Sequence, residues 1–171
     1  GACNNRAMNL FLFGFPIVVT VAVIVHACLR PRPGDSTRKL ALRVLAGGLL
    51  YGAIGPALGL AVVPLTLTIP DSLQNITGLQ VAYLIGGIPA LMCGMTAGAL
   101  KRVPFDWSVP AAVCGAGALY GYVFMLPIVG VDRIRSWTEA LQIGALPGLA
   151  AAALCSIPFL RMGAKKTTTP N

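Results

Sequence analysis

Few side chains in this sequence are suited to acid–base or nucleophilic chemistry. Membrane proton relays, ion pumps and carboxylate hydrolases need ionisable groups inside their membrane spans. All five carboxylates instead fall in loops or at the ends of apolar stretches: Asp35, Asp71, Asp106, Asp132 and Glu139. The one histidine, His26, lies near the end of such a stretch, which argues against a Ser–His catalytic pair. The sequence therefore predicts a protein that is not an enzyme and does not couple transport to protons.

Soft-metal binding is the other chemistry that we considered. Thiolates and imidazoles bind soft metal ions, and five such residues fall at a similar depth in the predicted membrane: His26, Cys28, Cys93, Cys114 and Cys155. None of these cysteines shares a CxxC spacing, and free cysteine is a common small residue at helix interfaces. We therefore predict no metal and no cofactor, with this cluster kept as the less favoured alternative.

Uncharged polar side chains within the apolar stretches are also candidates. We expect five of them to face inward: Ser156, and the four that we propose for a polar path, Thr96, Tyr120, Tyr122 and Gln142. Their hydroxyl and amide groups can satisfy one another across helices. The same groups can line a narrow path for an uncharged solute. The residue types alone do not decide between these two functions.

Glycine pairs at a spacing of four residues form the strongest pattern. The main pairs are Gly48 and Gly52, Gly94 and Gly98, Gly117 and Gly121, and Gly144 and Gly148. Glycines at this spacing share one helix face and let a second backbone approach closely. Because glycine is unfavourable in soluble helices, its repeated use indicates packing. We expect these faces to hold other helices, either of this chain or of a partner protein.

The elements that position these residues are predicted to be transmembrane helices. Of the 171 residues, 56% are hydrophobic and only 11% are charged, with a mean hydropathy of +0.78. Soluble domains carry about 25% charged residues, and a membrane helix needs roughly 20 apolar residues. Five stretches reach that length, at approximately residues 10–29, 44–67, 81–100, 111–131 and 141–160. The prediction is an all-α, polytopic integral membrane protein with a single membrane domain of about five transmembrane helices.

The predicted helices are not equivalent. The first is rich in bulky branched residues, which keep backbones apart, so we place it at the edge of a compact bundle of helices two to five. A duplicated hairpin is one interpretation of the bundle, because two motifs recur at constant offsets. Ile85, Gly86 and Pro89 match Ile143, Gly144 and Pro147, and Gly48, Tyr51 and Gly52 match Gly117, Tyr120 and Gly121. The alternative is chance similarity in a sequence rich in Gly, Ala and Leu.

Loop charge predicts the orientation. Lysine and arginine gather in loops that stay cytoplasmic, and they are concentrated in residues 30–43, after the third stretch and in residues 161–171. This pattern predicts a bacterial-type inner (plasma) membrane protein with its N-terminus outside and a basic cytoplasmic tail, residues 161–171. The turn at residues 131–140 also carries two arginines but would lie outside, where neighbouring acids are close enough to pair with them.

The net charge of +8 lies in short loops, which indicates lipid headgroups rather than nucleic acid as the partner. Our first functional hypothesis is a non-enzymatic membrane subunit or accessory protein that packs against partner helices, in a hetero-complex or a homo-oligomer. The second is a small transporter or channel for an uncharged solute or a soft metal. The third is a membrane immunity protein against a pore-forming toxin.

Overall fold

The computed structural model describes residues 2–30, 36–66, 76–101, 106–129 and 134–161, and within these ranges every regular element is helical. The elements are α1 (Ala2–Leu29), α2 (Thr37–Thr66), α3 (Ile76–Leu100), α4 (Ser108–Val129), α5 (Ile134–Ala140), η2 (Leu141–Ala145) and α6 (Leu146–Arg161). In this described part, five helical segments are long and apolar enough to cross a membrane. The all-α fold class is thus confirmed, and the five segments have the length and composition expected of a multi-pass membrane protein.

Several helices extend beyond the apolar stretches that predicted them. α2 begins at Thr37, inside the basic loop expected at residues 30–43, where the Ser36 hydroxyl accepts the Lys39 N–H at 3.3 Å. α4 begins at Ser108, whose N–H is 3.1 Å from an Asp106 carboxylate oxygen. Such polar caps satisfy helix N–H groups at an aqueous surface, so a helix can continue past its lipid-facing part. Residues 67, 130–131 and 162–171 of the predicted elements lie outside the described residues.

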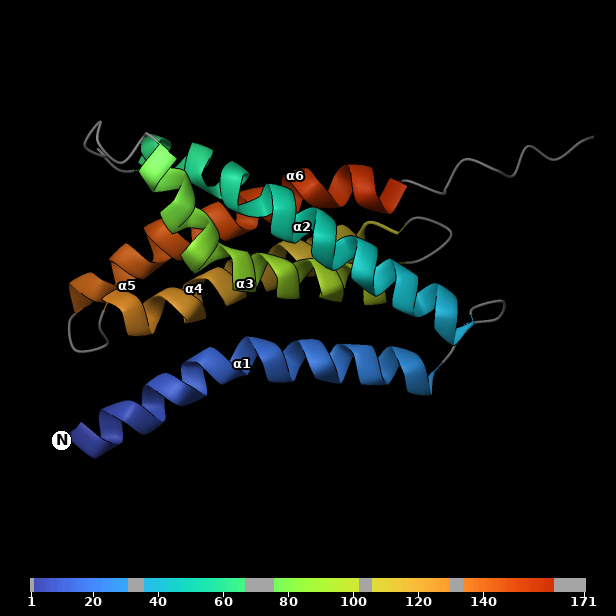
Figure 1. Ribbon diagram of the computed structural model, residues 1–171, viewed down its shortest axis with the longest axis horizontal. Coiled ribbons are helices and arrows are strands. Elements are labelled where there is room, and N and C mark those ends of the chain that lie inside the picture. Colours follow the sequence, from blue (N-terminus) through green and yellow to red (C-terminus); the bar gives the residue numbers. More distant parts are fainter. Residues whose placement is uncertain (1, 31–35, 67–75, 102–105, 130–133, 162–171) are drawn as a thin grey trace, which may run out of the picture.

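Four of the membrane-length segments contact one another in a closed order, which we call the ring. Figure 1 shows α1 running apart from the other helices along one side of the bundle. α2 packs on α3, α3 on α4, α4 on η2 and α6, and α6 returns to α2. α1 lies outside the ring against α3 and α4, and only 11% of its apolar window is buried, compared with 50% in the last segment. The ring is therefore the structural unit that encloses space, and α1 covers one side of it.

Glycine allows close backbone contact in two pairs of ring helices. A Cβ on Gly98 of α3 would lie 2.7 Å from the Val44 Cα of α2, and one on Gly117 of α4 would lie 2.6 Å from the Ala152 Cβ of α6. Gly94 lies against Gly47 in the first pair. Any larger side chain would push these helices apart, so the two hairpins α2–α3 and α4–α6 are held at backbone contact distance.

The last membrane segment is not one continuous α-helix. It changes to π-helix over η2, where the Leu146 N–H bonds to the Leu141 carbonyl, five residues earlier. Pro147 follows directly, and proline has no N–H to donate. The helix therefore widens at the residues where a proline prevents the regular bonding pattern, which apolar periodicity alone does not reveal.

The hairpins α2–α3 and α4–α6 differ in register at their glycine contacts. Gly52 lies 3.6 Å from the Leu91 side chain of α3, measured from an added Cβ, whereas Gly121, its counterpart in the proposed repeat, lies against Gly144. In the proposed repeat the counterpart of Gly144 is Gly86, which is not a neighbour of Leu91. The two hairpins therefore do not make equivalent glycine contacts. The duplicated hairpin remains a prediction from the sequence.

Candidate functional site

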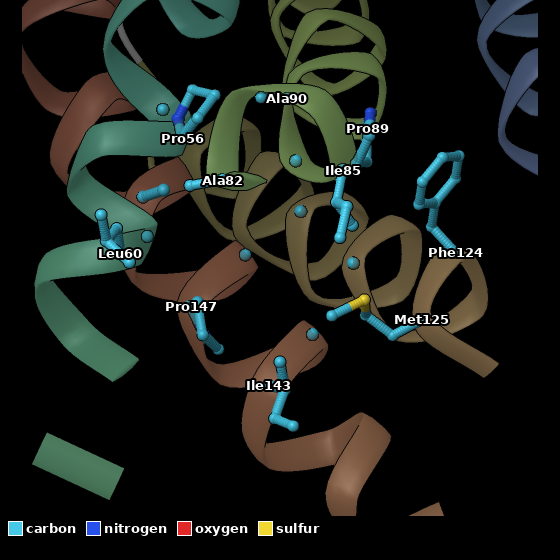
Figure 2. A pocket seen from close by; sticks show the side chains of 18 of the residues that line it. Pro56, Leu60, Ala82, Ile85, Pro89, Ala90, Phe124, Met125, Ile143 and Pro147 are labelled. Atoms are coloured by element: carbon cyan, nitrogen blue, oxygen red, sulfur yellow. The ribbon is translucent and has the colours of Figure 1, made fainter. Parts of the chain in front are cut away.

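A cavity of about 450 Å³, partly open to the outside, lies between the four segments of the ring (Figure 2). Each wall comes from a different ring segment: residues 51–63 of α2, 78–93 of α3, 117–125 of α4, and 143–152 of η2 and α6. These are the C-terminal halves of α2 and α4 and the N-terminal halves of α3 and the last segment. Because neighbouring helices run in opposite directions, all four stretches lie in the same half of the bundle.

The other half of the ring is filled with side chains. Tyr51, Tyr120, Val113, Ala97 and Phe159 are among a cluster of buried residues that pack together there. Tyr51 lies where the cavity meets this cluster, and its ring makes an edge contact with Phe159 at 6.2 Å between centroids. The cavity therefore has one end closed by packed aromatic and aliphatic side chains.

The lining of the cavity is almost wholly apolar. Among the described residues that line it, none is charged, and the side-chain heteroatoms are those of Tyr51, Cys93 and Met125. Leu60, Ile85, Phe124 and Ile143 represent the four walls, and Ile85 and Ile143 lie on walls that face each other across the space (Figure 2). Such a lining accommodates an uncharged molecule and disfavours a charged one.

The Tyr51 hydroxyl is buried, and it has no hydrogen-bond partner in the described structure. Tyr51 is only 2% exposed, so its hydroxyl is also withdrawn from the cavity surface. Ser156 of α6 faces the same region, but its hydroxyl donates to the Ala153 carbonyl at 3.1 Å. The aromatic side chain of Tyr51 therefore closes one end of the cavity, and its hydroxyl does not supply an exposed polar group.

The four predicted polar residues are not gathered into one path. Thr96 and Tyr120 are buried with their hydroxyl oxygens 3.3 Å apart, and Thr20 of α1 completes their cluster by donating to Tyr120 at 3.3 Å. Tyr122 and Gln142 are half-buried. None of the four predicted residues lines the cavity between the ring helices. Sequence reasoning missed Thr20, although it is the only hydroxyl residue in the apolar stretch 10–25.

The predicted soft-metal alternative is not assembled as a site. Cys93 and Cys155 are buried, Cys114 is half-buried, and Cys28 is exposed. No three histidine, cysteine or acidic side chains in the described ranges come together to hold a metal ion. The Cys93 thiol instead donates to the Val113 carbonyl at 3.6 Å, as a small buried residue in a helix interface does.

The eight predicted packing glycines all face neighbours within this chain. Gly48 and Gly52 lie against Leu91, and Gly94 and Gly98 lie against α2. The remaining four lie where α4 meets η2 and α6, and they also line the cavity: Gly117, Gly121, Gly144 and Gly148. Their surfaces are covered internally, so partner binding through these glycines would require the bundle to open.

A lysine lies at the closed end of the ring. Lys101, just beyond α3, donates its ammonium N–H to the Phe159 carbonyl in the last turn of α6 at 2.6 Å, and its nitrogen lies 4.5 Å from the centre of the Phe159 ring. Burial, and then the nearby Arg43, lower the pKa of Lys101. Lys101 therefore ties α3 to the end of α6 at the cost of partial desolvation.

A second hollow, of about 670 Å³, lies outside the ring, between α1 and the ends of α2 and α3. Its lining includes His26 and Arg30. Both hollows are partly open, and this one lies against α1, the least buried of the membrane-length segments. The cavity between the ring helices is the better candidate for a selective site, because four segments define its shape.

The fold and the cavity define a class: an all-helical bundle with five segments long and apolar enough to cross a membrane, and with an uncharged, partly open cavity between four of them. Comparison of this chain with models of protein families, with curated proteins and with solved structures finds no match. The geometry of the cavity is therefore the basis for assigning a function.

Proposed function

We propose that this protein binds a small, uncharged, mainly apolar solute in the cavity between the ring helices and carries it across a bacterial-type inner membrane. The observation that carries the proposal is the uncharged cavity of about 450 Å³ with walls from four helical segments. Small-molecule sites in proteins are concave, mostly apolar and of roughly 300–1,000 Å³. The cavity therefore favours the second functional hypothesis, a small transporter or channel, over a purely structural subunit.

The proposed orientation gives the cavity a direction. With the N-terminus outside and the C-terminus inside, residues 51–63, 78–93, 117–125 and 143–152 lie toward the outer surface. The buried cluster that contains Tyr51 and Phe159 then closes the inner half. This arrangement resembles the outward-facing state of an alternating-access carrier, in which release requires the inner half to separate.

The test of this proposal is photolabelling with an apolar alkyl diazirine in lipid nanodiscs. Labelled peptides should be enriched in the four cavity walls relative to the lipid-facing surface of α1. The Ala82→Phe variant should fill part of the cavity and reduce this enrichment, because Ala82 lines it. Leu84→Phe is the matched control, since Leu84 lies on the same helix but is 79% exposed. Uniform labelling of cavity and lipid-facing residues would refute the proposal.

A second candidate is the accessory-subunit function. The observation that favours it is the exposed apolar surface of α1, on which Phe11 is 69% and Val18 is 67% exposed. Lipid covers such a surface as well as a partner helix does, and a toxin-immunity function would use the same surface. Co-purification in mild detergent tests the candidate: a stoichiometric partner that is lost in a Phe11→Ala, Val18→Ala variant supports it, whereas a pure preparation of this chain argues against it.

A further inference from the structure

The cavity contains one sequence motif twice, on two different walls. The motif is Ile-Gly-x-x-Pro, at residues 85–89 of α3 and at residues 143–147 of η2 and α6. A proline at position i cannot donate to the carbonyl of residue i−4. Ile85 and Ile143 therefore each have a backbone carbonyl that lacks its normal helical donor. Such a carbonyl is costly within a membrane unless another group satisfies it.

Both freed carbonyls belong to the face of the helix that lines the cavity. In an α-helix the carbonyl of residue i points along the axis toward the nitrogen of residue i+4, on the same face. Ile85 and Pro89 both line the cavity, and so do Ile143 and Pro147 (Figure 2). The carbonyl group of each isoleucine, which points toward its proline, is thus directed along the cavity wall.

Glycine leaves the Ile85 peptide group uncovered, whereas the Ile143 peptide group on the other wall is followed by a buried glycine that packs against α4. The Ile85 carbonyl belongs to the peptide bond with Gly86, which lines the cavity; the nearest contact to a Cβ added there is Pro56, at 3.8 Å. On the other wall, Gly144 packs against Gly121 of α4 and also lines the cavity.

We infer that the solute carries at least one hydrogen-bond donor, a hydroxyl or an N–H group, on a mainly apolar body. The described lining offers backbone acceptors on two facing walls and no charge. Anions are excluded because the exposed backbone groups are acceptors. A bare cation is excluded because a few carbonyls without a carboxylate do not replace its hydration shell, which filters replace with rings of carbonyls. This inference rests on the proposed function, and it specifies that the proposed substrate has a polar end with a hydrogen-bond donor.

The experiment compares a diazirine-bearing alkanol with its methyl ether, which has the same apolar body and no donor. Cavity labelling in nanodiscs is normalised to labelling of the lipid-facing side of α1. We expect the alkanol to label the cavity more strongly, by roughly threefold for the one hydrogen bond that its O–H group can donate, the equivalent of about 0.6 kcal/mol. Pro89→Ala and Pro147→Ala restore the missing N–H groups. Each single variant should lower the preference only in part, because one acceptor remains for the O–H group, and the double variant should remove the preference.

Pro56→Ala is the matched control. Pro56 also lines the cavity, but the carbonyl that it frees belongs to Gly52, which lies against Leu91 and is not part of the lining. The preference for the alkanol should survive this change. Equal loss in Pro56→Ala would overturn the inference, because the preference would then not depend on the two Ile-Gly-x-x-Pro motifs.

The two proposals fail in different ways. Equal cavity labelling by alkanol and ether in the unmodified protein would overturn the donor inference and leave cavity binding intact. No enrichment in the cavity with either probe would refute the proposed function itself. A second measurement needs no variant: with 13C-carbonyl isoleucine, the alkanol should shift an amide I component to lower frequency, and the ether should not. Absence of that shift under saturating alkanol would also overturn the inference.

Discussion

Three hydroxyl groups from three helices meet where α1 joins the ring. Thr96 donates to the Met92 carbonyl of its own helix at 2.9 Å, which leaves its oxygen to accept from Tyr120. Tyr120 in turn accepts from Thr20 of α1. All three side chains are at most 3% exposed. This chain of donors satisfies every buried hydroxyl in it and gives the least enclosed helix a specific contact with the ring.

A double-mutant cycle tests this contact. Thr20→Val and Tyr120→Phe remove the two hydroxyls with little change in shape, and their coupling should be about 0.6 kcal/mol, the average for hydrogen bonds in membrane proteins. Chemical unfolding in detergent measures the four free energies. Strictly additive effects would show that the hydroxyls do not interact.

The pKa of Lys101 predicts a dependence on pH. Burial lowers that pKa in the folded protein, so between the folded and unfolded pKa values the unfolded chain binds more protons. Stability must then rise with pH in that window. We expect the melting temperature of the protein, relative to Lys101→Arg, to increase as the pH rises toward the ordinary lysine pKa of about 10.4, because arginine stays charged. The same exchange at exposed Lys39 is the control, and a pH-independent difference at Lys101 would contradict the prediction.

The contact between α2 and α3 depends on the absence of side chains. A methyl group on Gly98 would lie 2.7 Å from the Val44 Cα, whereas one on Gly115 of α4 would meet nothing within 4 Å. Gly98→Ala should therefore destabilise the protein by about 1–3 kcal/mol through overpacking. Gly115→Ala should be neutral or stabilising, because alanine favours helix. Thermal unfolding in detergent measures both, and equal effects would mean that α2 and α3 do not approach at Gly98.

Hydropathy predicts the membrane segments because apolar length is a property of the sequence alone. The ends of the helices were less accessible, since the caps at Ser36 and Asp106 are polar and lie outside the apolar stretches. Glycine spacing indicated close packing but not which helices would meet. The π-turn and the cavity were not predictable, because one follows from a local bonding conflict at Pro147 and the other is space left between four helices.

For the whole molecule, the proposed orientation can be tested by cysteine accessibility. In a variant without native cysteines, Gln80→Cys should react with a membrane-impermeant maleimide added outside intact cells, because Gln80 is exposed at the start of α3. Arg38→Cys, exposed at the start of α2, should react only after permeabilisation. The reverse labelling pattern would show that the orientation is opposite to the one proposed and that the cavity lies toward the cytoplasm.

The π-helical segment also changes how the last membrane segment can evolve. Successive residues of an α-helix are turned by about 100°, and a π-turn is equivalent to one residue inserted into that helix. η2 thus offsets the rotation of the helix before it from that of the helix after it. α5, with Trp137, lies before η2, and α6, with its core face, lies after it. Loss of one residue within η2 would turn α5 by about a third of a circle while leaving the packing of Phe159 and Leu160 in place. A single-residue deletion or insertion at this point can therefore reshape one wall of the cavity without repacking the closed half of the bundle.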